Sequence, residues 1–126
     1  MKKTGGLVAA LFLLAACGGP EKDATYDSVE ALRDAAIEAG YECPNWEQRN
    51  QVTAAAQSGS CSTADVFATY LSEAARDEAV NNLKAFAADF DDMPVTVLAG
   101  PNWTINAPDE AVHELHEKLG GTVVGG

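Results

Sequence analysis

Apolar side chains recur at helical spacing in three parts of the chain. In residues 27–39, Val29, Leu32, Ala36 and Ile37 fall on one face of a helix, and charged side chains occupy most of the other face. Asp27 and Glu30 have the spacing of a capping box, and the glycine at position 40 is the expected stop. The pattern predicts a first helix over residues 27–39.

Two further helices are predicted over residues 73–89 and 108–119. Ser72 is the expected cap of the former, with Arg76 and Lys84 toward solvent, and Pro108 suits the first turn of the latter. The predicted buried positions are Ala79, Val80, Leu83, Phe86 and Ala87 in the former and Val112, Leu115 and Leu119 in the latter.

Strand patterns lie between and after these helices. Residues 65–71 alternate with apolar side chains on both faces, which predicts a central strand. Residues 95–98 and 103–105 flank Gly100-Pro101-Asn102 and predict a hairpin, and residues 122–124 predict a short edge strand. The combination favours an α+β fold, a small antiparallel sheet with helices packed mainly on one face.

Residues 41–62 are the least regular part of the chain. Pro44-Asn45 breaks the pattern, and Ser58-Gly59-Ser60 predicts a turn. Short strands over 43–47 and 51–56 are compatible with the sequence, but alanines do not distinguish a strand from a helical turn over 52–56.

The N-terminus has the pattern of an export signal. Ten apolar residues, 7–16, follow Lys2 and Lys3, and this run is shorter than the roughly 20 residues that span a bilayer. Its end, Leu14-Ala15-Ala16-Cys17, resembles a bacterial lipobox. That resemblance implies cleavage before Cys17 and lipidation of its thiol. The alternative is cleavage by the ordinary signal peptidase, with Cys17 incidental.

This interpretation divides the chain into four parts. Residues 1–16 are the expected signal peptide, and 17–25 are the lipidated cysteine and a flexible tether without apolar periodicity. Residues 26–124 form the expected single α+β domain, and 125–126 are a disordered tail. We expect the protein at the extracytoplasmic face of the cell membrane.

The net charge of the chain limits the classes of molecule that it is expected to bind. Cleavage after residue 16 removes Lys2 and Lys3, so the formal net charge of −11 becomes −13. An acidic domain repels phosphate backbones and anionic lipid headgroups, which argues against nucleic acid as a partner. The membrane is therefore expected to be contacted through the lipid on Cys17.

Cys43 and Cys61 are the remaining thiols once Cys17 carries lipid. In an exported chain such an even pair usually forms a disulfide, which is what we predict. The rival interpretation, a reactive or metal-binding pair, lacks CxxC spacing and a nearby histidine.

Two clusters could hold a metal ion. His113 and His116 are three residues apart on the predicted last helix, so both imidazoles could reach one ion, although the spacing differs from the zinc-protease motif. Asp89, Asp91 and Asp92 gather carboxylates at a helix end, but the following residues do not fit the calcium loop of an EF-hand. For both clusters we favour the simpler interpretation of a solvated surface.

Aromatic side chains are the remaining candidates for ligand contact. Trp46 and Trp103, with Tyr41 and Tyr70, could form a platform for a sugar or peptide. In a domain this small two tryptophans more often belong to the core. Ser58 and Ser60 lack the strand-turn-helix setting of a nucleophile elbow, so no catalytic residue is predicted.

Together these segments resemble small actinobacterial lipoproteins of unknown function. The resemblance rests on the lipobox, Gly59-Ser60-Cys61, the strand 66–70 before a helix, and residues 98–104. It implies a location and no activity. We therefore expect a lipid-anchored, non-catalytic binding or interaction module without a cofactor, whose partner is a protein or a small ligand. The alternative is a metal-binding lipoprotein that uses His113 and His116.

Overall fold

The structure is a computed structural model that describes residues 20–50, 52, 54–88 and 96–125. Its centre is a six-stranded sheet in the order β1-β2-β3-β5-β4-β6, in which every pair of neighbours is antiparallel. The strands are β1 (Glu47–Gln48), β2 (Gln57–Ser60), β3 (Val66–Thr69), β4 (Thr96–Ala99), β5 (Trp103–Asn106) and β6 (Thr122–Gly125). As predicted, β3 is central and β4 and β5 form a hairpin.

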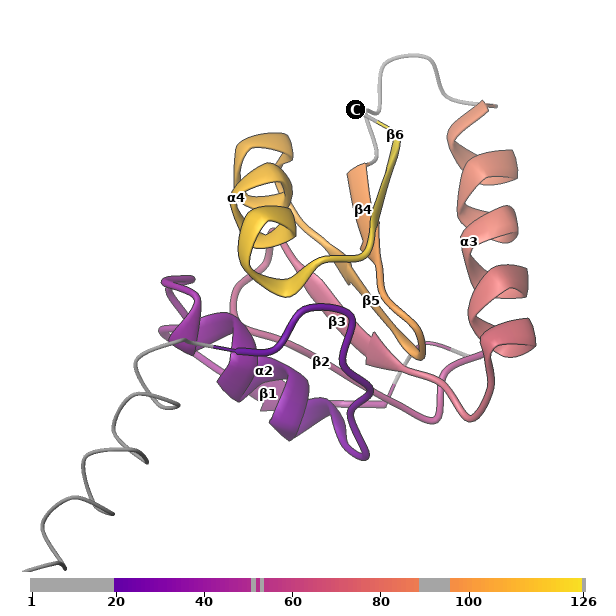
Figure 1. Cartoon of the computed structure of the whole chain (residues 1–126). Coiled ribbons are helices and arrows are strands. Elements are labelled where there is room, and N and C mark those ends of the chain that lie inside the picture. The colour runs from indigo at the N-terminus through magenta and orange to yellow at the C-terminus, as the bar shows by residue number, and fades with distance from the viewer. Residues whose placement is uncertain (1–19, 51, 53, 89–95, 126) are drawn as a thin grey trace, which may run out of the picture.

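Helices cover both faces of this sheet, but unequally. Helices α2 (Val29–Glu38) and α4 (Asp109–Leu119) lie on one face, and α3 (Glu73–Ala88) stands on the other (Figure 1). This arrangement confirms the predicted α+β class, with an antiparallel sheet whose helices pack mainly on one face. No helix among the described residues is long and apolar enough to span a bilayer.

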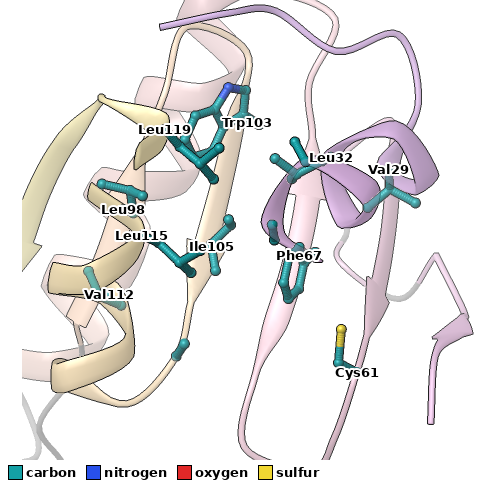
Figure 2. Packing of buried hydrophobic residues seen from close by; sticks show 13 residues of the cluster. Val29, Leu32, Cys61, Phe67, Leu98, Trp103, Ile105, Val112, Leu115 and Leu119 are labelled. Carbon is teal, nitrogen blue, oxygen red and sulfur yellow. The ribbon is translucent and has the colours of Figure 1, made fainter. Parts of the chain in front are cut away.

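The main core lies between the sheet and the helix pair α2 and α4. Phe67 from β3 and Trp103 and Ile105 from β5 point toward this side and are fully buried (Figure 2). The helices contribute apolar stripes to this core, which are Val29, Leu32, Ala35 and Ala36 from α2 and Val112, Leu115 and Leu119 from α4. The prediction was wrong for Ile37, which is 46% exposed. Large interlocking side chains therefore fill this face of the sheet.

Helix α2 begins two residues later than predicted. The cap is Ser28, whose hydroxyl accepts a hydrogen bond from the Ala31 amide at 3.1 Å, so the capping box assigned to Asp27 and Glu30 was wrong. Ser28 has the extended backbone of an N-cap, which places its oxygen over the free amides of the first turn. The predicted stop is confirmed, because Gly40 has a φ of +106° that suits glycine.

The irregular segment contains a strand where a turn was predicted. Ser58-Gly59-Ser60 belongs to β2, which pairs with β3 on one side and with β1 on the other. Glycine is needed here because a side-chain carbon at position 59 would come within 2.8 Å of the Trp46 ring and the Glu47 carbonyl. The glycine at position 59 is therefore explained by close packing within the sheet and not by a turn.

The predicted disulfide between Cys43 and Cys61 is present, with 4.6 Å between the Cα atoms. It fastens the segment before β1 to the end of β2. The adjacent Asp65 is buried, and its carboxylate accepts hydrogen bonds from the amides of Cys61 and Ser62 and from the Tyr41 hydroxyl. These contacts order the least regular part of the described chain.

Helix α3 begins as predicted, because the Ser72 hydroxyl accepts a hydrogen bond from the Ala75 amide. Two side chains of α3 differ from the predicted pattern of buried and exposed positions. Phe86, predicted to be buried, is 49% exposed, and Arg76, predicted to face solvent, donates to the carbonyls of Gly100 and Pro101. The helix touches the sheet mainly through its N-terminal half, so its last turns lie farther from the core (Figure 1).

Both ends of the domain are more ordered than predicted. Gly125, assigned to the tail, is the last residue of β6 and pairs with Thr96, while Gly126 lies outside the described residues. Asp23, assigned to the tether, donates its amide to Leu119 and accepts from the Gly121 amide through its carboxylate. Asp23 therefore belongs to the folded part.

Candidate functional site

A pocket of about 600 Å³ lies between α3 and the face of the sheet that α3 covers. The sheet contributes Val66, Ala68, Tyr70, Thr104 and Asn106, the helix contributes Glu78, Ala79, Asn82 and Leu83, and the segment before β2 contributes Val52 and Ala54. Side chains from β3 and β5 that alternate with the core residues form its floor. The pocket exists because alanines at positions 68 and 79 face each other, where larger side chains would fill the gap.

Two hydroxyl groups meet at the floor of this pocket. The Tyr70 hydroxyl lies 3.1 Å from the Thr104 hydroxyl, and both residues are more than nine-tenths buried. Burial raises the pKa of the Tyr70 phenol, and the hydrogen bond with Thr104 opposes part of the rise, so the phenol is protonated at neutral pH. Each hydroxyl group carries one hydrogen. One of the two hydrogens forms the bond between Tyr70 and Thr104, so the other can be donated to a ligand oxygen.

The rim of the pocket carries the remaining polar groups. Glu78 and Asn82 are one helical turn apart on α3, and Asn106 lies opposite them at the end of β5. Among the described residues that line the pocket, Glu78 carries the only formal charge. It forms no ion pair within the described part of the chain.

Contacts with the β4–β5 turn hold the helix over the pocket. Arg76 donates to the Gly100 and Pro101 carbonyls, and the Tyr70 amide donates to the Asn102 carbonyl at 2.8 Å. The Asn102 side chain in turn bonds both the amide and the carbonyl of Tyr26. The turn predicted from Gly100-Pro101-Asn102 therefore fixes the start of α3 and the N-terminal segment together.

A second hollow of about 570 Å³ lies beside β1 and β2. Its polar lining is largely satisfied by internal contacts. Arg49 pairs with Glu47, and the Ser60 and Ser62 hydroxyls both donate to Asp65. It offers a ligand fewer apolar contacts than the pocket under α3.

The structure does not bring Trp46 and Trp103 together as a ligand platform. Trp103 is fully buried, lies against Gly100, and donates from its indole nitrogen to the Ala24 carbonyl. Trp46 is half-buried, packs edge-on against Phe67 and carries the Arg33 guanidinium over its ring at 5.2 Å. Neither residue lines the pocket under α3. Both serve the core on the opposite face of the sheet.

His113 and His116 contact different partners on α4. His113 Nε2 lies 3.4 Å from an Asp109 carboxylate oxygen at the start of the helix, whereas His116 Nδ1 lies 3.2 Å from the Gly120 carbonyl at its end. The two rings therefore lean toward opposite ends of the helix. Within the described ranges, no group of three or more His, Cys, Asp or Glu side chains could hold a metal ion.

Two of the predicted sites, Cys17 and the acidic residues Asp89, Asp91 and Asp92, lie outside the described residues. Of the four aromatic candidates, Tyr70 alone lines the pocket. The pocket itself was missed, because its signal in the sequence is weak. Alanines at positions 75 and 79 follow helical spacing and Ala68 lies on the outward face of β3, but small residues alone do not show that a space is left open.

Comparison with known proteins finds no relative whose residue roles could be transferred to this chain. No family model matches the chain, and neither does a curated protein or a solved structure.

Proposed function

We propose that this chain is a lipid-anchored, extracytoplasmic binding module that takes a small, mostly apolar molecule into the pocket under α3. One observation carries the proposal, namely a preformed pocket of about 600 Å³ with apolar walls and a few convergent polar groups. Pockets of this size and make-up are typical of small-molecule sites. The ligand is expected to place its apolar body between Ala68, Ala79 and Leu83 and its polar head at the rim of the pocket.

The polar groups of the pocket support binding rather than catalysis. They are two hydroxyls, two side-chain amides and one carboxylate, and no described histidine or cysteine lines the pocket. A tyrosine with a raised pKa and a threonine without a neighbouring base do not form an activated nucleophile. Such groups can orient a ligand by hydrogen bonds.

The proposed location is supported by the disulfide and by the position of the N-terminal segment. A disulfide such as Cys43–Cys61 persists in oxidising compartments outside the cytosol. Asp23 is held against Leu119 and Gly121, so five residues, 18–22, separate it from Cys17. Such a segment reaches about 20 Å at most, which keeps the domain close to the membrane that holds the lipid.

The binding proposal is tested by filling the pocket. Ala79→Leu adds three carbons inside the pocket, and Ala85→Leu makes the same change at an exposed position of the same helix. With the full chain in phosphatidylcholine nanodiscs and 4-phenylbutan-1-ol as the probe, saturation-transfer NMR should show binding that Ala79→Leu weakens about tenfold or more. The Ala85→Leu variant should bind as the unmodified chain does. Equal binding by all three proteins, or by none, would overturn the proposal.

The anchoring proposal is tested separately by Cys17→Ala. Removal of the thiol abolishes lipidation, so the protein should move from the membrane fraction to the soluble or secreted fraction. Cys43→Ala serves as the control, since it removes a thiol but leaves the lipidation site. Unchanged membrane retention of Cys17→Ala would contradict the lipid anchor without bearing on the pocket.

A further inference from the structure

The formal charge in the described lining of the pocket under α3 is negative. Its described lining contains one carboxylate, Glu78, and no lysine, arginine or histidine. The nearest basic residue toward the N-terminus of the helix, Arg76, is engaged with Asp77 and with the carbonyls of the β4–β5 turn. No described lining group is therefore available to neutralise an anionic ligand.

The position of Glu78 determines which part of a ligand it would meet. Glu78 is exposed and lies at the rim, next to the buried Ala79, while the hydroxyls of Tyr70 and Thr104 lie at the floor. A ligand with its apolar body between the helix and the sheet would leave its head at this rim. The amide groups of Asn82 and Asn106 are in reach of the same head and can accept or donate hydrogen bonds.

We infer that the pocket selects amphiphiles with a cationic head, an ammonium group at Glu78, over neutral and anionic molecules with the same apolar body. The inference rests on the proposed function and adds a ligand class to it. An ammonium group would gain a carboxylate that forms no ion pair with the described residues. A carboxylate at the same place would be repelled by Glu78 and by the negative net charge of the chain.

The effect should be modest because Glu78 is in contact with water. Exposed ion pairs are screened, and the expected gain of an ammonium over an alcohol is about threefold. The preference should decline as salt is raised, since surface charges interact over about 10 Å at 0.1 M ionic strength. Binding of the neutral alcohol should not depend on salt.

The test compares three probes that share one body, namely 4-phenylbutylammonium, 4-phenylbutan-1-ol and 4-phenylbutanoate. Each is titrated by saturation-transfer NMR into the full chain in phosphatidylcholine nanodiscs, with empty nanodiscs subtracted. We expect the ammonium probe to bind about threefold more tightly than the alcohol and about tenfold more tightly than the carboxylate. In Glu78→Gln the ratio of ammonium to alcohol affinity should fall about threefold.

Glu114→Gln is the matched control, because it removes the same charge from an exposed position on α4, across the sheet from the pocket. It should leave the affinity ratio unchanged. If the alcohol binds but the ratio is equal in the unmodified chain and Glu78→Gln, the charge selection is wrong and the pocket remains. If Glu114→Gln lowers the ratio as much as Glu78→Gln, the preference comes from overall charge and the inference is also wrong. If no probe binds, both the inference and the proposed function fail.

Discussion

The two faces of the sheet are packed by opposite means. On the face toward α2 and α4, Phe67, Trp103 and Leu98 interlock with the helix stripes and are fully buried. On the face toward α3, the described cluster consists of alanines and Tyr70, and a pocket of about 600 Å³ remains. The same strands thus supply stability on one side and an accessible cavity on the other. A small domain can keep an open pocket if its other face carries the core.

The largest effect is expected from Trp103→Ala on the packed face. The substitution leaves a cavity in the core and removes the hydrogen bond to the Ala24 carbonyl, so the free energy of unfolding should fall by about 3–5 kcal/mol. Urea denaturation checks this. Trp46→Ala, which removes a half-buried indole from the same cluster, should cost less. A loss below about 1.5 kcal/mol for Trp103→Ala would mean that this face is not the principal core.

Removal of the disulfide should have the next largest effect. The double variant Cys43→Ala with Cys61→Ala should lose about 3 kcal/mol, because the reduced chain gains the entropy of a loop of about 17 residues when it unfolds. The comparison with reduced, unmodified protein controls for the changed side chains. Equal stability of the oxidised and reduced forms would show that the Asp65 network alone orders this segment.

An alanine-to-leucine substitution made once on each face of the sheet compares the packing of the two faces directly. Ala36→Leu places a larger side chain in the packed core and should cost about 1–3 kcal/mol, whereas Ala79→Leu enters the pocket and should cost less than about 1 kcal/mol. Both positions are on helices and are buried, so helix propensity changes equally. An equal or larger loss for Ala79→Leu would contradict an open space under α3.

The smallest expected effect is the pH dependence that comes from the partly buried Tyr41 and the buried Tyr70. Burial raises the pKa of Tyr41, and the hydrogen bond to Asp65 and the charge of that carboxylate raise it further. A phenol with a raised pKa in the folded state contributes stability below the unfolded pKa of about 10 and loses it as the pH rises further. The urea midpoint should therefore decline above about pH 10, and Tyr41→Phe should flatten the decline.

Tyr70→Phe provides the matching measurement on the other face. The hydrogen bond with Thr104 opposes the effect of burial on the pKa of Tyr70, so this variant should flatten the alkaline decline less than Tyr41→Phe does. The opposite order would show that Tyr70 is the more strongly coupled phenol.

Segments with a strongly periodic sequence pattern form the helices and strands predicted for them, whereas the weaker patterns were misinterpreted. The stripe Val112, Leu115 and Leu119 and the turn Gly100-Pro101-Asn102 gave α4 and the β4–β5 hairpin at nearly the predicted bounds. Ser58-Gly59-Ser60 was wrongly assigned to a turn, because a glycine is used both for turns and for close packing in a sheet. Asp27 and Ser28 are both good caps, and the sequence did not distinguish them.

What the sequence determined by itself was local, namely the three amphipathic helices, the central strand, the hairpin and the pairing of Cys43 with Cys61. Periodicity and the number of cysteines decide these features without reference to distant residues. Only the tertiary structure decided that β2 inserts beside β3, that Arg76 holds the β4–β5 turn, and that a pocket opens under α3. Each of these depends on which surfaces meet across the fold, and alanines meeting alanines leave a space that no single segment of the sequence shows.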